Sequence, residues 1–138
     1  MKFTKKEIAD MLGKDKRTIT FWADIGLVEA TNRDHIKRGV ARKFDEYNLI
    51  EFFLIDVLSS SGVGLEYIKR LMSHFRVSKS NGSLSCHDFM FRTHPIAMTY
   101  KKGFKEVTIH FGEAMYFAVS KLRETKIWRD FYAAIKSA

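Results

Sequence analysis

The stretch that decides the fold is residues 15–28, which read Asp-Lys-Arg-Thr-Ile-Thr-Phe-Trp-Ala-Asp-Ile-Gly-Leu-Val. Asp15 is a favourable N-cap and Gly26 is a favourable helix stop, so the pattern predicts a helix from Lys16 to about Ile25. The apolar residues of this helix recur at a spacing that places them on one side. The other side is polar and cationic, so one side can pack on the protein while the other faces a partner.

Helical spacing assigns the side chains to these two faces. Ile19, Trp22 and Ile25 lie on the apolar face, and Lys16, Arg17 and Thr20 lie on the polar face. We therefore expect Trp22 to belong to the core rather than to a binding surface.

A second helix is predicted just upstream. Thr4 and Glu7 have the spacing of a capping box, apolar residues follow at helical spacing, and Gly13 ends the pattern. The two helices and the short turn between them make a helix-turn-helix.

The segment after the helix-turn-helix is polar and basic. Residues 31–43 are expected to form a short β-hairpin, or wing, that closes into Val40–Phe44. Asp45 then caps a third helix, about Glu46 to Ser60, whose apolar residues cover more than one face, as in a central core helix. A fourth helix is predicted from about Leu65 to His74.

Residues 77–85 read Val-Ser-Lys-Ser-Asn-Gly-Ser-Leu-Ser and are expected to be a linker. This linker would divide the chain into units of residues 1–76 and 86–138. The predicted fold class is mainly α with small β. It consists of an N-terminal winged helix-turn-helix, with four helices and a wing hairpin, and a C-terminal α+β unit with a β-hairpin and a terminal helix.

In the second unit, the spacing of the apolar residues changes from a helical period to an alternating one. Apolar residues alternate around Phe89 and Phe91, and Gly112-Glu113 separates two apolar runs in the manner of a type II′ hairpin. We therefore predict strands at Lys105–Phe111 and Ala114–Val119, followed by a last helix capped by Ser120. The alternative is a single long helix from Glu113 to Lys136.

The overall charge favours a polyanionic partner. The 138 residues include 24 Lys+Arg and 16 Asp+Glu, a formal net charge of +8. Such a balance suggests nucleic acid or an acidic membrane face. Most of the excess lies in residues 73–138, which hold 11 basic and 5 acidic side chains.

Cysteine usage and hydropathy indicate the compartment. Cys86 is the only cysteine, so no intramolecular disulfide can form, which fits a reducing cytosol. The longest apolar stretch is too short to span a bilayer, and no signal peptide is visible. We expect a cytoplasmic protein that does not act at a membrane.

Four blocks of sequence resemble the MerR family of transcription regulators: residues 3–9, 15–28, 39–45 and 62–68. The resemblance covers about residues 3–73. Thr20 stands where the family pattern has a second arginine, and Phe21 has no hydroxyl group at the first aromatic position.

The resemblance implies a bacterial transcription regulator that binds double-stranded DNA as a homodimer, with RNA polymerase as a further candidate partner and no effector indicated. The predicted DNA-contacting residues are Thr4, Lys14, Lys16, Arg17, Thr18, Thr20, Phe21, Arg33, Lys37, Arg38, Arg42 and Lys43. Arg17 can bond both acceptors of a guanine edge or clamp a phosphate. The wing residues Arg38, Arg42 and Lys43 can neutralise phosphates along the flank.

No catalytic, metal or cofactor site is predicted. Cys86-His87-Asp88 places three donors in a row, but adjacent residues cannot easily turn all three toward one ion, and no zinc-site spacing is present. The sequence has no glycine-rich phosphate loop and no nucleophile elbow. An enzyme is therefore not expected.

Several alternatives stay open. Family members commonly dimerise through a long helix directly after the fourth helix, where this chain has the expected linker. The C-terminal unit could be a dimerisation unit or a ligand pocket. The whole chain could instead be a phage-type excisionase or DNA-architectural accessory protein with the same winged fold. It could also be a ligand-binding sensor whose DNA domain has decayed.

Overall fold

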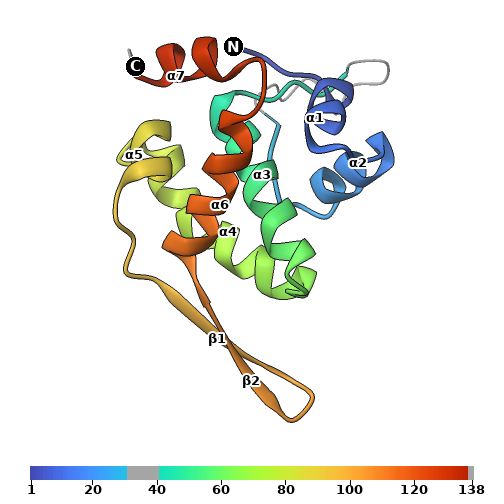
Figure 1. Cartoon of the computed structure of the whole chain (residues 1–138), viewed down its shortest axis with the longest axis vertical. Coiled ribbons are helices and arrows are strands. Elements are labelled where there is room, and N and C mark those ends of the chain that lie inside the picture. Colours follow the sequence, from blue (N-terminus) through green and yellow to red (C-terminus); the bar gives the residue numbers. More distant parts are fainter. Residues whose placement is uncertain (31–40, 137–138) are drawn as a thin grey trace.

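A computed structural model describes residues 1–30 and 41–136. The elements are α1 (Lys5–Leu12), α2 (Lys16–Asp24), α3 (Glu46–Ser60), α4 (Leu65–Ser80), α5 (Cys86–Phe91), β1 (Ala97–Lys102), β2 (Lys105–His110), α6 (Phe111–Arg123) and α7 (Trp128–Lys136). The described chain is mainly helical with one small antiparallel sheet (Figure 1), which confirms the predicted class in its coarse form. None of the described helices combines the length and apolarity that crossing a membrane requires.

Local capping explains the first two helices. The Thr4 hydroxyl accepts a hydrogen bond from the Glu7 amide while the Glu7 carboxylate accepts one from the Thr4 amide, so the predicted capping box is confirmed. Gly13 ends α1 in the left-handed conformation, with φ of 64°. The Asp15 carboxylate caps α2 by accepting from the Arg17 amide.

A short bridge ties the N-terminal residues to the segment that precedes α3. The Phe3 amide donates to the Phe44 carbonyl at 2.7 Å, and the Phe44 amide donates back at 3.0 Å. Both rings are buried, and the Phe44 ring packs edge-on against Phe52 of α3 at 5.1 Å. The bridge therefore fixes the start of α1 beside the end of the predicted wing. Residues 31–40, on which most of the predicted wing falls, lie outside the described residues.

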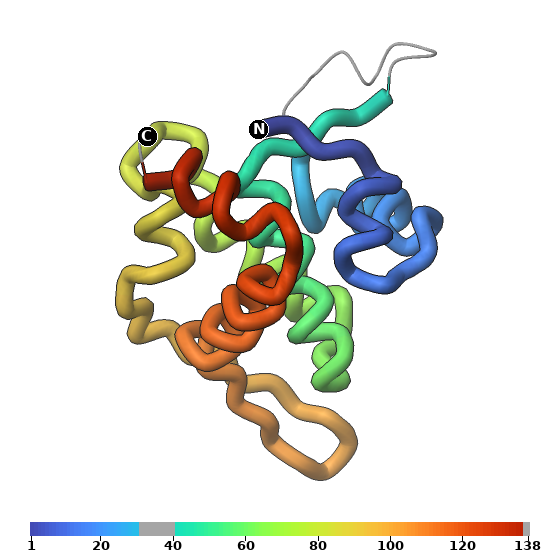
Figure 2. Tube along the Cα trace, turned by 45° about the horizontal axis from the view of Figure 1, so that its top comes forward, coloured from blue at the N-terminus to red at the C-terminus, as the bar shows by residue number. Residues whose placement is uncertain are grey.

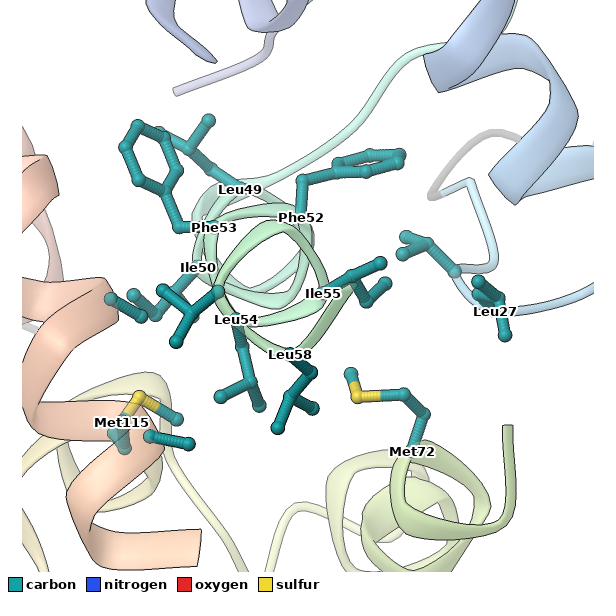
Figure 3. Close-up of a cluster of buried hydrophobic side chains, with 14 of the residues drawn as sticks. Leu27, Leu49, Ile50, Phe52, Phe53, Leu54, Ile55, Leu58, Met72 and Met115 are labelled. Carbon is teal, nitrogen blue, oxygen red and sulfur yellow. The ribbon is translucent and has the colours of Figure 1, made fainter. Parts of the chain in front are cut away.

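The central helix α3 is buried all around, as predicted. Every residue from 47 to 58 is buried, and side chains such as Leu49, Phe52 and Leu54 point outward in several directions (Figure 3). The chain wraps this helix with α1, α4, α5 and α6. One buried apolar cluster runs from Phe3 to Ile135, so both halves of the chain contribute to it. The division into units of residues 1–76 and 86–138 stays a prediction.

Helix α4 is longer than predicted. It continues past His74 to Ser80, through the first residues of the expected linker 77–85. Phe75 is buried, and the Lys79 ammonium lies 3.0 Å from the Glu51 carboxylate of α3. These contacts stabilise six additional helical residues, the last of which, Ser78-Lys79-Ser80, are not favoured as helix by their sequence alone.

Glu51 is expected to make stability depend on pH. Burial raises the pKa of this carboxyl above its ordinary value of 4.5, although Lys79 acts in the opposite direction. The folded protein then retains a proton that the unfolded chain has lost, so the free energy of unfolding falls as the pH rises above about 4.5. Urea titrations from acid to neutral pH should show Glu51→Gln gaining stability relative to wild type along this range. A difference that stays constant with pH would contradict the assigned shift.

The sheet differs from the predicted hairpin. The predicted strand at Lys105–Phe111 is confirmed as β2, but its partner is β1 on the upstream side, with Met98 opposite Ile109. The strand predicted at Ala114–Val119 is wrong, because these residues belong to α6. Gly112 is the second residue of that helix rather than a turn residue.

The remaining C-terminal elements also differ from expectation. The alternation around Phe89 and Phe91 belongs to the short helix α5, not to a strand. Ser120 does not cap a last helix, since it lies inside α6 and its hydroxyl donates to the Tyr116 carbonyl at 2.8 Å. The alternative of a single long helix to Lys136 is also wrong, because α6 ends at Arg123 and α7 begins at Trp128.

Candidate nucleic-acid interface

Helix α2 presents two chemically different faces, as predicted. Ile19 and Trp22 are buried, with Trp22 only 4% exposed. Lys16 and Arg17 are exposed, and the Phe21 ring is 48% exposed. The prediction that Trp22 is a core residue is confirmed, and its neighbour Phe21 is the aromatic ring that a partner can reach.

The exposed side of α2 forms a continuous stripe. Thr20 and Phe21 come three and four residues after Arg17, and Asp24 comes four and three residues after them, so the four side chains share one side of the helix. The Thr20 hydroxyl donates to the Lys16 carbonyl at 3.0 Å, so its remaining hydrogen-bonding capacity is as an acceptor. Thr18 is half-buried beside this stripe.

Arg42 meets the same stripe at its far end. Its guanidinium forms an ion pair with the carboxylate of Asp24. The second terminal nitrogen of Arg42 is buried and has no hydrogen-bond partner among the described residues. Arg17 and Asp24, the partner of Arg42, therefore mark the two ends of one helix face, about 10 Å apart along the axis. Asp24 was not predicted, although its seven-residue spacing from Arg17 could have identified it.

Lys14 forms an ion pair with the buried carboxylate of Asp56. Its ammonium lies 3.3 Å from one oxygen of Asp56 in α3, and Lys121 of α6 lies 3.4 Å from the other. Asp56 is only 4% exposed, and its contact with Lys14 is an ion pair without hydrogen-bond geometry. Lys14 thus joins the turn before α2 to two other helices. A cleft of about 740 Å³ opens beside this group, between α1 and the end of α6.

The other predicted contacts are distributed around α2. Thr4 is exposed at the start of α1, and Lys43 is exposed one residue before the Phe44 bridge. Arg33, Lys37 and Arg38 lie outside the described residues. The structure thus brings Thr4, Lys14, Lys16, Arg17, Thr18, Thr20, Phe21, Arg42 and Lys43 onto or around the two helices α1 and α2. Their contact with DNA stays a prediction.

An arginine side chain of α4 holds the turn that follows α2. The Arg76 guanidinium donates to the Gly26 carbonyl at 2.8 Å. Gly26 has φ of 84°, a backbone conformation that favours glycine, and a side chain there would meet the Lys69 ammonium. The orientation of α2 is therefore set by α4 as well as by α1.

The Cys86 segment shows none of the features of a reactive or metal-binding site. Burial raises the pKa of the Cys86 thiol, so the thiolate is disfavoured, and the sulfur contacts Met90 at 4.0 Å. Within residues 1–30 and 41–136, no three His, Cys, Asp or Glu side chains are grouped so that they could hold a metal ion.

Comparison with known proteins agrees with this geometry. A family model described as MerR HTH family regulatory protein matches residues 3–74. The match covers just over half of the chain, from the Phe3 bridge to most of α4. A search of the curated proteins found no significant match.

Proposed function

This chain belongs to the MerR family of helix-turn-helix regulatory proteins, and on that premise we propose that it regulates transcription by binding a specific double-stranded DNA site as a homodimer. The observation that carries the proposal is the exposed stripe of α2. Its buried side rests on the core through Ile19 and Trp22, so its polar side is free to enter a major groove.

The residues around this helix suit a division of labour on DNA. Arg17 and Thr20, near the start of α2, are placed to read base edges. Lys43 and the residues of the winged arrangement that we propose for 31–43 would lie along the phosphate backbone. Arg42 would join them by leaving Asp24, whose carboxylate a phosphate can replace as its partner.

The homodimer is supported by apolar surface in the C-terminal half. Phe91, Tyr116 and Phe117 are large side chains left exposed on α5 and α6. Tyr116 contacts Phe117 and lines one hollow together with Phe91, and contiguous exposed apolar surface is what marks a protein contact. A second copy would cover them, which makes the C-terminal half the dimerisation unit. We propose that the dimer acts in the bacterial cytoplasm, with RNA polymerase as a further candidate partner.

The test is selection of binding sites by the full chain from a randomised duplex library, followed by footprinting. A homodimeric regulator should protect a near-palindromic site about two helical turns long, with two chains per duplex. Analytical ultracentrifugation of the complex would count the chains. Protection of several adjacent sites by single chains that bend the DNA would instead identify an excisionase-type accessory protein.

A further inference from the structure

The β1–β2 hairpin projects from the helical body and ends in a basic tip. Figures 1 and 2 both show it extending away from the helices. The tip consists of residues 101–105, Lys-Lys-Gly-Phe-Lys, and all five are exposed. Phe104 is fully exposed, and Gly103 makes the tight turn with φ of 64°. These five residues are called the hairpin tip below.

Two features of the hairpin tip oppose folding. The strand register places Lys102 directly opposite Lys105, and like charges in this position repel each other. Phe104 gains nothing from the core because it is fully exposed. Neither Lys101 nor Lys105 forms an ion pair with any described residue. Unfavourable local choices of this kind are typical of functional positions, where a partner compensates for them.

The base of the hairpin is fixed to α4. The Tyr100 ring packs on Tyr67 with centroids 4.5 Å apart, and the Arg70 guanidinium lies over the same Tyr67 ring. The Lys102 ammonium donates to the carbonyl of Gly62, in the turn before α4, at 3.4 Å. The hairpin is therefore a positioned arm rather than a free loop.

The same helix connects the arm to the helix-turn-helix. Lys69 of α4 lies beside Gly26 at the end of α2, and Arg70 follows it on the exposed surface. Lys69 and Arg70 thus lie between the end of the helix-turn-helix and the base of the hairpin, where Arg70 also pairs with Glu66 of α4. The hairpin also belongs to the half of the chain that holds most of the positive charge, which the helix-turn-helix does not account for.

From these observations we propose that the hairpin tip is a second DNA-binding element. It contacts the phosphate backbone of duplex DNA next to the site held by α2, and it sets Phe104 against a sugar or base in the groove. The inference rests on the proposed function, because it assumes that α2 is on DNA. Strands of six residues reach about 20 Å, and the duplex offers a phosphate charge every 1.7 Å or so of its axis.

The chemistry of the tip favours DNA over a protein partner. Its three lysines are accompanied in the adjoining strand by the single carboxylate of Glu106, so its field is cationic. A tip-to-tip contact with a second copy would bring six lysines together. An exposed aromatic ring between lysines is a common combination on nucleic acids, where the ring stacks and the lysines neutralise phosphates.

The experiment compares three variants of the full chain by fluorescence anisotropy over a range of salt concentrations. The first is Lys101→Ala with Lys105→Ala, which spares the Lys102 contact to Gly62. The second is Phe104→Ala. The control is Arg129→Ala with Lys136→Ala, which removes the same charge from exposed positions of α7, at the opposite end of the molecule (Figure 1). The probes are the selected site with random flanks of about 10 base pairs, and the same site without flanks.

On the flanked probe, the hairpin lysine variant should lower the slope of log affinity against log salt by about 2, since each phosphate contact contributes roughly 0.9. Phe104→Ala should lose affinity about 10-fold with an unchanged slope, as expected for a lost stacking contact. Neither loss should appear on the probe without flanks, and the control variant should match wild type on both.

Three results would overturn the inference. Hairpin variants that bind the flanked probe with wild-type affinity and slope would leave the proposed function intact and show that the hairpin tip does not contact DNA. A change in oligomeric state without a change in slope per chain would assign the tip to a second copy. A wild-type chain that binds no duplex would reject both proposals together, which separates failure of the arm from failure of the helix-turn-helix.

Discussion

Replacement of Arg17 by alanine is expected to weaken binding to the selected DNA site by about 1–3 kcal/mol, the usual worth of a bidentate contact to a base. Arg17 is exposed at the start of α2, where its amide donates to the carboxylate of the N-cap Asp15 and its side chain lies off the core face. Competition against random duplex should show that most of the loss is in specificity. Arg129→Ala, which removes an exposed arginine from α7, is the matched control and should bind as wild type does.

A second substitution separates base reading from charge. Arg17→Lys keeps the positive charge but loses the planar fork that matches two acceptors of guanine. If Arg17 reads a base, the lysine variant should lose nearly as much specificity as the alanine variant. If Arg17 holds a phosphate, the lysine variant should recover most of the affinity. Wild-type binding by Arg17→Ala would mean that α2 is not the helix that reads DNA.

The largest change in the free energy of unfolding is expected for the buried aromatic residue of α2, Trp22. Trp22→Ala should lower the free energy of unfolding by about 3–5 kcal/mol, because it empties a large buried site. Phe21→Ala, one residue earlier, should change it by no more than about 0.5 kcal/mol, since half of that ring is already in solvent. Urea denaturation followed by circular dichroism measures both without relying on Trp22 fluorescence.

The functional readout should be opposite for these two variants. Phe21→Ala should weaken DNA binding at unchanged stability, whereas Trp22→Phe, a milder core change, should lose some stability and keep specificity. A Trp22→Ala chain that stayed as stable as wild type but lost DNA binding would place that indole on the DNA and contradict its position in the core.

The N-terminal half could be predicted from sequence because its signals are local. Capping pairs such as Thr4 with Glu7, and the stop at Gly13, act within a few residues, so they survive without knowledge of the fold. The polar face of α2 follows from the same short-range spacing. The end of α4 was not predictable in this way, because the Lys79 contact with Glu51 joins residues that are distant in sequence.

The prediction for the C-terminal half was wrong in its strands and helices for an identifiable reason. The pair Gly112-Glu113 separates two apolar runs, whereas Gly103-Phe104 is flanked by lysines, yet the second pair makes the turn and the first lies at a helix start. Helix α6 hides its period because its outer side carries Tyr116 and Phe117 instead of charges. When only the local sequence is considered, a helix whose exposed face carries aromatic residues has the same apolar pattern as a buried strand.

For the candidate site, sequence identified the exposed polar face of α2 but not the ion pairs beside it. Arg42 with Asp24, and Lys14 with Asp56, connect segments that meet only in the folded chain. No regular spacing in the sequence indicates that the two residues of such a pair will meet. Three wing residues of the prediction, Arg33, Lys37 and Arg38, lie outside the described residues and keep the status of a prediction.

The carboxylate of Asp56 has a consequence for control of the protein. It is shared between Lys14, in the turn that leads into α2, and Lys121, on a helix of the C-terminal half, so the two lysines compete for one buried charge. With Lys14 at the DNA interface, as we propose, a molecule that entered the neighbouring cleft and drew Lys121 away from Asp56 would strengthen the pairing of Asp56 with Lys14 and alter the affinity for DNA. By thermodynamic reciprocity, occupancy of the operator would change the affinity for that molecule by the same factor.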